Sequence, residues 1–244
     1  MGGLTVLKAL RAELPDADFI YLGDTARLPY GTKTPETVRR YSEQAARLLV
    51  ERGVESLVIA CNTASGLALK HLQNVFAPLP LFGVVEPGAQ AAAEVMDETG
   101  VLVLATESTV AGGAYQASLS AISPDIPIET RACPLWVTLA EQGITDGPLT
   151  QAIVQHDMRE GGPNTVLLGC THFPVFKSFL RQQYPHHRFV DSAATTASAV
   201  RDELKQVEGR GSTQFLVTDG TDRFGRVGSY FLGEEISDVE LVDL

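Results

Sequence analysis

Two short stretches of the chain decide the fold: VIACNT at residues 58–63 and VLLGCTH at residues 166–172. Each begins as an apolar run without polar alternation, the pattern of a strand that helices cover on both faces of a parallel sheet. Each run then reaches a small residue, a cysteine and hydrogen-bonding residues before a helical pattern starts. The repeat predicts two related α/β halves, each with one thiol at the carboxyl end of a strand.

Around these stretches, short apolar runs alternate with amphipathic helical patterns along nearly the whole chain, as expected of β–α–β units with parallel strands. In one well-marked helix, Thr34 suits the N-cap, Pro35 the first turn and Gly53 the end. Strands are expected at residues 57–60, 81–84, 101–105, 126–129, 165–168, 188–190 and 214–218.

The predicted fold class is α/β, with two pseudo-symmetric domains, each a largely parallel sheet flanked by helices. We assign residues 1–84 plus 194–244 to the first domain and residues 85–193 to the second. The first domain carries Cys61 and the second carries Cys170. Ligands of open α/β sheets bind beyond the carboxyl ends of the strands, so we expect the active site in the cleft between the domains.

Composition excludes several classes of protein. The 244-residue chain has a formal net charge of −11 and no cluster of Lys and Arg, so we expect no direct binding to nucleic acid. No apolar run is long enough to span a membrane, and no signal-peptide layout opens the chain, so we expect a cytoplasmic protein. The three cysteines are then free thiols, each with a packing or a chemical role.

The placement of the two repeated cysteines suggests a chemistry. A cysteine that directly precedes a helix has backbone N–H groups and the positive end of the helix dipole near its sulfur, so we expect lowered pKa values for Cys61 and Cys170. A racemase needs a base on one face of a carbon and an acid on the other, and these roles exchange in the reverse reaction. Two equivalent thiols facing one cleft, one charged and one neutral, meet this need.

Other interpretations of the same residues stay open at this point. Cysteine is among the most buried residue types, so Cys61 or Cys170 taken alone could be a packing residue, as we expect of Cys133. His172 suits an auxiliary acid/base, a metal ligand or a capping residue, although its spacing from the cysteines matches no usual zinc site. The sequence has no nucleotide, flavin or pyridoxal motif, and we expect neither a cofactor nor a metal.

A series of motifs runs along the chain: GGLTV at residues 2–6, DTARLPYG at 24–31, ACNTAS at 60–65, EPG at 86–88, TEST at 106–109, CPLWVTLAE at 133–141 and GCTHFP at 169–174. In this order they resemble the successive motifs of the glutamate racemases, in the aspartate/glutamate racemase superfamily. The resemblance extends from Met1 to about Gly233, nearly the whole chain.

The resemblance implies a cofactor-independent enzyme that interconverts L- and D-glutamate and supplies D-glutamate for peptidoglycan in the cytoplasm. It implies that Cys61 and Cys170 are the two acid/base thiols, and that His172 and Glu141 are auxiliary residues that tune them. The residues that it implies for substrate binding are Tyr30, Gly31, Asn62, Thr63, Thr171 and His172. Members of the family also suggest a homodimer, activation by a cell-wall precursor and, in some relatives, binding to DNA gyrase.

The chain departs from the family pattern at its first motif. That motif usually reads Asp-Ser-Gly-x-Gly-Gly after a short apolar strand, whereas the chain begins at the x position with Met1 and Gly2. We therefore expect an unfilled slot in the first sheet, unpaired strand edges and an active site that lacks one carboxylate. A chain extended by about ten residues, one strand plus a turn, is expected to be the more active form.

Three alternative functions remain at this stage. One is a racemase of aspartate or another acidic amino acid, although the CTHFP run at residues 170–174 and the PYG run at 29–31 favour glutamate by resemblance. Another is a catalytically impaired relative that binds DNA gyrase. The third is a thiol hydrolase or transferase that uses one cysteine with His172 and forms a covalent acyl intermediate.

Overall fold

Strands and helices alternate along the chain in the computed structural model, which describes residues 1–158, 161–204 and 207–244. The strands are β1 (Phe19–Gly23), β2 (Leu57–Ile59), β3 (Leu81–Gly83), β4 (Val101–Ala105), β5 (Ile128–Ala132), β6 (Thr165–Gly169), β7 (Arg188–Val190), β8 (Thr213–Val217) and β9 (Val239–Leu241). The α-helices are α1 (Leu4–Glu13), α2 (Pro35–Glu51), α3 (Asn62–Val75), α4 (Val85–Ala93), α5 (Glu107–Gly112), α6 (Ala114–Ile122), α7 (Pro134–Glu141), α8 (Gly147–Met158), α9 (Lys177–Gln183), α10 (Ala193–Leu204) and α11 (Thr221–Leu232). Short 3-10 turns are η1 (Thr25–Arg27), η2 (Tyr30–Thr32) and η3 (Phe173–Phe176).

A four-stranded parallel sheet, in the order β5-β4-β6-β7, forms one half of the molecule. All residues of β4 and β6 are buried, because their side chains alternate between two apolar layers. Leu104 and Leu168 pack with Trp136 on one face, whereas Val103 and Leu167 pack with α4 and α6 on the other. The unalternating apolar runs of the sequence are therefore strands covered on both faces, as predicted.

The other half contains two separate parallel sheets, one of order β1-β8-β9 and one of β2 with β3. Helices α2 and α3 cover β2 and β3, and α1 packs against α10. Within the described residues, β1 pairs with β8 alone and β2 with β3 alone, so each has one unpaired edge.

The sequence patterns locate most elements correctly. Every predicted strand overlaps an observed one, with boundaries within about three residues, the usual uncertainty of such boundaries. The marked helix is also confirmed: Thr34 Oγ1 accepts a hydrogen bond from the Thr37 N–H at 3.3 Å, and Pro35 begins α2. Gly53 follows its end with φ of +81°, a conformation that favours glycine. Strands β1 and β9 were not among the predictions.

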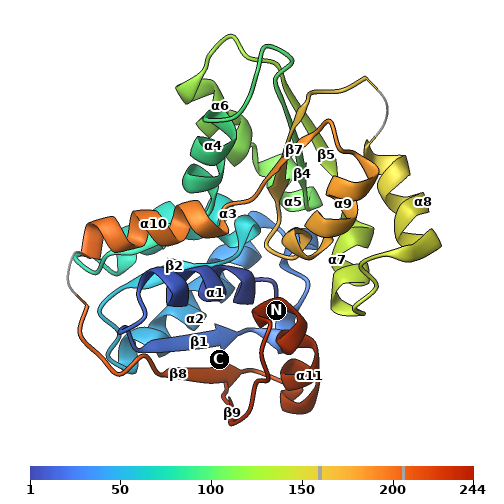
Figure 1. The fold of residues 1–244 in the computed structure, drawn as a ribbon. Coiled ribbons are helices and arrows are strands. Elements are labelled where there is room, and N and C mark those ends of the chain that lie inside the picture. Colours follow the sequence, from blue (N-terminus) through green and yellow to red (C-terminus); the bar gives the residue numbers. More distant parts are fainter. Residues whose placement is uncertain (159–160, 205–206) are drawn as a thin grey trace.

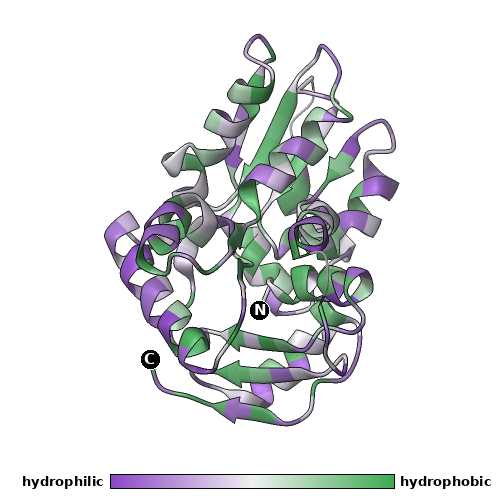
Figure 2. Ribbon diagram, turned by 90° about the vertical axis from the view of Figure 1, so that its left-hand side faces the viewer, coloured by the Kyte–Doolittle hydropathy of each residue, from purple (hydrophilic) through white to green (hydrophobic). Residues whose placement is uncertain are grey.

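The molecule consists of two halves, one above the other in Figure 1. The four-stranded sheet lies in the upper half, whereas β1, β8 and β9 lie in the lower half with α1, α2, α11 and both termini. Apolar residues follow the strands, and polar residues gather on loops and outer helix faces (Figure 2). The α/β fold class is confirmed, and the domain boundaries stay a prediction.

Among the described helices, none has the length and apolar character needed to cross a membrane.

Candidate active site

A cavity of about 310 Å³ lies where the two halves meet, and both repeated cysteines line it. Cys61 is the N-cap residue of α3 and is separated from β2 by Ala60 alone, and Cys170 directly follows β6. The cavity brings together every site residue predicted from the sequence: Tyr30, Gly31, Cys61, Asn62, Thr63, Glu141, Cys170, Thr171 and His172. Its apolar end extends between β1 and β2, where Ile20, Leu22 and Ile59 line it.

Backbone N–H groups and polar side chains lie around Cys61. The backbone N–H groups of Thr63 and Ala64 act on its sulfur, because the first turn of α3 leaves these donors unpaired. Asn62 is buried, and its Oδ1 accepts a hydrogen bond from the Tyr115 hydroxyl. Its Nδ2 is buried without a partner among the described residues. This free amide donor lines the cavity and is suited to an acceptor such as a substrate carboxylate.

Three threonine hydroxyls meet across the junction of the two halves. Thr63 Oγ1 lies 2.9 Å from Thr106 Oγ1 and 3.0 Å from Thr109 Oγ1, and the latter two are 2.9 Å apart. Gly31 packs so closely on Thr106 that a Cβ at this position would lie 2.6 Å from it. The Ser108 hydroxyl donates to the Gly31 carbonyl at 2.8 Å, which holds η2 against α5. The close approach explains why glycine stands at this position.

The loop that carries Tyr30 is held by one carboxylate, Asp24. Asp24 accepts hydrogen bonds from the Tyr30 hydroxyl, from Arg27 Nε at 3.0 Å and from the Thr218 hydroxyl at 3.0 Å. Thr218 follows β8, so these contacts tie the loop after β1 to the adjacent strand. Asp24 itself lines the cavity.

Ionisable groups form a chain beside Cys170. Cys170 Sγ lies 3.7 Å from His172 Nδ1, and His172 Nε2 lies 3.2 Å from Glu141 Oε1. The other carboxylate oxygen of Glu141 accepts a hydrogen bond from Arg223 Nη2 at 2.9 Å. The Gly2 N–H also lies 3.3 Å from His172 Nε2, but a carboxylate is the stronger partner. We therefore place the His172 proton on Nε2, which leaves Nδ1 free to accept the thiol proton.

The thiol pKa values differ from the prediction made from the sequence. Burial raises the pKa of Cys61, although the N–H groups of Thr63 and Ala64 act in the opposite direction. Burial likewise raises the pKa of Cys170 to about 12. The expectation of lowered thiol pKa values was wrong because desolvation of the buried thiolates outweighs the backbone N–H groups.

The neighbouring acid and base behave differently from each other. Burial opposes ionisation of Glu141, but hydrogen bonds from His172 and Arg223 outweigh it and hold its pKa at about 2. Burial lowers the pKa of His172, although Glu141 acts in the opposite direction. At neutral pH the pair is therefore an ionised carboxylate beside a neutral imidazole, which can accept a proton from Cys170.

The structure adds residues that the sequence analysis did not assign to the site. They are Asp24, Thr106, Thr109, Tyr115 and Arg223. Asp24 and the Thr106–Thr109 turn lie within motifs that were noted, so a signal existed for them, whereas no local pattern marks Arg223. Cys133 is fully buried beside Trp136 in the core, as its packing interpretation predicted. In the described ranges, no group of three His, Cys, Asp or Glu side chains could hold a metal ion.

Comparisons with known proteins agree with this geometry. The model of the family described as Asp/Glu/Hydantoin racemase matches residues 5–200. A glutamate racemase of Geobacter metallireducens is 44% identical, over 100% of this chain and 94% of the relative. The crystal structure of glutamate racemase from Thermus thermophilus in complex with β-chloro-D-alanine matches with a TM-score of 0.88 and 39% identity, covering 100% and 93% of the two chains. That of Francisella tularensis in complex with D-glutamate has a TM-score of 0.91 and 29% identity, covering 100% and 94%.

Proposed function

The chain belongs to the Asp/Glu/Hydantoin racemase family, and we propose that it is a glutamate racemase in which Cys61 and Cys170 exchange the α-proton. One observation carries the proposal: two thiols, one from each half of the molecule, line the same small cavity. The similarity to proteins named glutamate racemase supports the choice of substrate.

The proposed reaction needs two proton transfers and no redox step. The thiolate of one cysteine removes the α-proton, and the electron pair stays on the α-carbon as a planar carbanion. The thiol of the other cysteine then donates its proton to the opposite face. After one turnover the protonation states of Cys61 and Cys170 are exchanged, so the enzyme is ready for the opposite enantiomer.

The raised thiol pKa values fit this reaction once substrate is bound. In the free cavity both thiols are mainly neutral, because burial disfavours the thiolate. The ammonium group of glutamate brings a positive charge into the same desolvated space, and an adjacent positive charge favours the thiolate. His172 can accept the proton that Cys170 releases, whereas Cys61 faces backbone and hydroxyl groups.

The polar groups around the cavity are suited to the two carboxylates of glutamate. The unpartnered Nδ2 of Asn62 and the hydroxyls of Thr63 and Thr106 line the cavity and can donate to carboxylate oxygens. Thr171 and the loop of Tyr30 and Gly31 complete the lining. We also propose that the product serves peptidoglycan synthesis in the cytoplasm. The homodimer, the cell-wall-precursor activator and gyrase binding stay predictions of the family resemblance.

Proton NMR of the protein with L-glutamate in D2O, combined with circular dichroism of the amino acid, tests the proposal. Loss of both the α-proton signal and the optical signal is expected, with aspartate at least about tenfold slower because a shorter acid leaves polar partners unpaired. A faster reaction with aspartate would replace glutamate as the substrate. The Cys170–His172 contact would also suit a thiol hydrolase, which forms a covalent acyl-enzyme. A racemase forms no such adduct, so we expect intact-mass spectra without an acyl adduct.

A further inference from the structure

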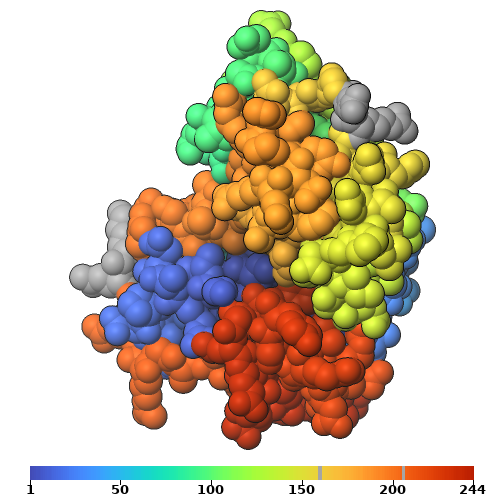
Figure 3. All heavy atoms as spheres, turned by 45° about the vertical axis from the view of Figure 1, so that its right-hand side comes forward, coloured from blue at the N-terminus to red at the C-terminus, as the bar shows by residue number. Residues whose placement is uncertain are grey.

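Helix α11 belongs to one half of the molecule and contacts site residues of the other half. It follows β8 in the sheet of β1, β8 and β9, whereas α7 and η3 belong to the half with the four-stranded sheet. Figure 3 shows the red C-terminal segment lying against the yellow-green segment that contains α7. The helix therefore brings side chains of one half to groups of the other.

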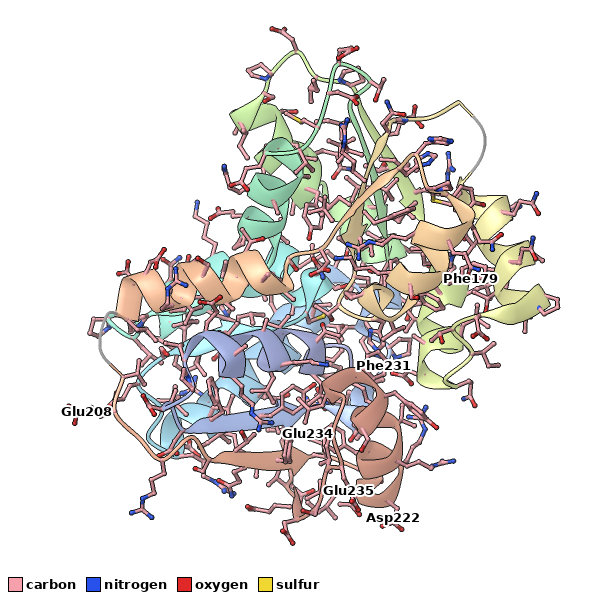
Figure 4. All side chains as sticks on the ribbon, viewed as in Figure 1. Phe179, Glu208, Asp222, Phe231, Glu234 and Glu235 are labelled. Carbon is pink, nitrogen blue, oxygen red and sulfur yellow. The ribbon has the colours of Figure 1, made fainter. Side chains whose placement is uncertain are left out.

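Two side chains of α11 contact the chain of ionisable groups beside Cys170. Arg223 Nη2 donates to Glu141 Oε2 at 2.9 Å, and the Phe231 ring meets the His172 ring edge-on, with centroids 5.3 Å apart and an interplanar angle of 85°. Figure 4 labels Asp222 and Phe231 at opposite ends of this helix. Phe224 and Leu232 anchor the helix in the core, so the two contacts are held from a fixed element.

The two carboxylate oxygens of Glu141 have different partners, and the two contacts together hold the carboxylate in one orientation. Oε1 faces His172 Nε2 at 3.2 Å, and Oε2 accepts from Arg223. A carboxylate held at both oxygens keeps one rotamer, and the rotamer directs Oε1 at the imidazole. The imidazole then keeps its proton on Nε2 and offers Nδ1 to Cys170. The alternative, a surface ion pair of no consequence, fits poorly because the Glu141 side chain is only 15% exposed.

We propose that Arg223 is a positioning residue for Cys170: it holds Glu141 so that His172 serves proton transfer on the Cys170 face and not on the Cys61 face. The inference rests on the proposed racemase function. Arg226, three residues further along α11, is also exposed and forms no ion pair in the part of the chain that the structure describes, which makes it a matched control.

Racemisation rates alone cannot test an effect on one face. The two glutamate enantiomers are equal in free energy, so the equilibrium constant is one. In every variant, kcat/KM for L-glutamate must therefore equal kcat/KM for D-glutamate. A chlorine on the β-carbon removes this constraint: once the α-proton is taken by one base, chloride leaves from the β-carbon, and no second proton transfer is needed. Chloride release from the β-chloro derivative of each glutamate enantiomer therefore reports on one thiol. Cys61→Ser and Cys170→Ser identify which enantiomer reports on which thiol.

The decisive comparison is between Arg223→Gln and Arg226→Gln. We expect Arg223→Gln to slow chloride release about tenfold from the enantiomer that Cys170 deprotonates, within the range for lost supporting contacts, and to change the other less than about twofold. Arg223→Lys, which keeps the charge, should recover part of the loss, and Arg226→Gln should change neither rate. Equal losses for both enantiomers, no loss for either, or an unfolded Arg223→Gln protein would overturn the inference.

A second measurement separates this inference from the proposed function. Iodoacetamide alkylates thiolates, and peptide mass spectrometry gives separate rates for Cys61 and Cys170 without any substrate. We expect Arg223→Gln to lower the Cys170 rate severalfold relative to the Cys61 rate, and an unchanged ratio would overturn the positioning role. A natural-sequence protein that neither racemises glutamate nor releases chloride would refute the proposed function, while the alkylation ratio would still test Arg223.

Discussion

The two cysteines occupy equivalent places in the fold but differ in their chemical surroundings. We define the Cys61 side as Cys61, Asn62, Thr63, Thr106 and Thr109, and the Cys170 side as Cys170, His172, Glu141 and Arg223. The Cys61 side offers backbone N–H groups, hydroxyls and an amide, whereas the Cys170 side offers an imidazole, a carboxylate and a guanidinium. A repeated strand-end position thus leaves each half free to stabilise its thiolate by different means.

The local chain explains part of this difference. Cys61 is the N-cap residue of α3, which runs for 14 residues, so its sulfur lies near unpaired N–H groups. Cys170 is followed by the short 3-10 turn η3, in which Pro174 provides no N–H group, and only then by α9. The sequence predicted that a helix follows each cysteine. An α-helix directly follows Cys61, whereas a 3-10 turn separates Cys170 from α9. His172 supplies a proton acceptor where helix donors are fewer.

The largest effect that tests this comparison is expected from replacing each thiol. Cys61→Ser and Cys170→Ser should each lower glutamate racemisation by about 10³-fold, because a serine hydroxyl is far too weak an acid to supply the conjugate base. Circular dichroism of the substrate measures the rate. Cys133→Ala, at the buried third cysteine, should stay within about threefold if its role is packing. Near-normal turnover in either serine variant would remove the two-thiol mechanism.

An intermediate effect is expected from the hydroxyl cluster on the Cys61 side. Thr106→Val removes hydrogen bonds to Thr63 and Thr109 and should raise KM for both glutamate enantiomers by about tenfold with little change in kcat, as for loss of uniform binding. Thr165→Val is the control, since its buried hydroxyl has no partner among the described atoms and lies outside the cavity. A loss confined to kcat would mean that this side acts in proton transfer rather than in binding.

The smallest effect concerns the stability that the Cys170 side gains from its carboxylate. Glu141 has a folded-state pKa of about 2, below the unfolded value of about 4.3, so its contribution is present above pH 4.3 and is lost as the pH falls toward 2. Urea unfolding at pH 7 should show Glu141→Gln less stable by about 1–3 kcal/mol, and at pH 3 the difference should shrink by about half. A constant difference between the two pH values would contradict the ionised pair.

The fold was largely predictable because burial patterns are local. Strands β4 and β6 are apolar at every position, and Thr34 with Pro35 marks the start of α2 without any reference to the rest of the chain. Strand β1 has a comparable apolar run but is only half-buried, and its partner β8 lies far away in the sequence. Its place in a sheet therefore depended on a pairing that no local pattern encodes.

The site was predictable where it follows strand ends and was not predictable where separate segments meet. Cys61 and Cys170 follow β2 and β6, so the topology of parallel strands was enough to place both thiols near the cleft. Arg223 reaches Glu141 from a helix 82 residues later in the chain, and only tertiary packing brings them together.

By itself, the sequence determined the parallel α/β architecture, the repeated strand-end thiols and part of the set of residues that line one cavity. The tertiary structure decided how those thiols ionise and which groups support each of them. The physical reason is that hydrophobic periodicity acts over a few residues, whereas desolvation depends on every segment packed around a group. For this reason the cysteine positions were predicted correctly, while the direction of their pKa shifts was not.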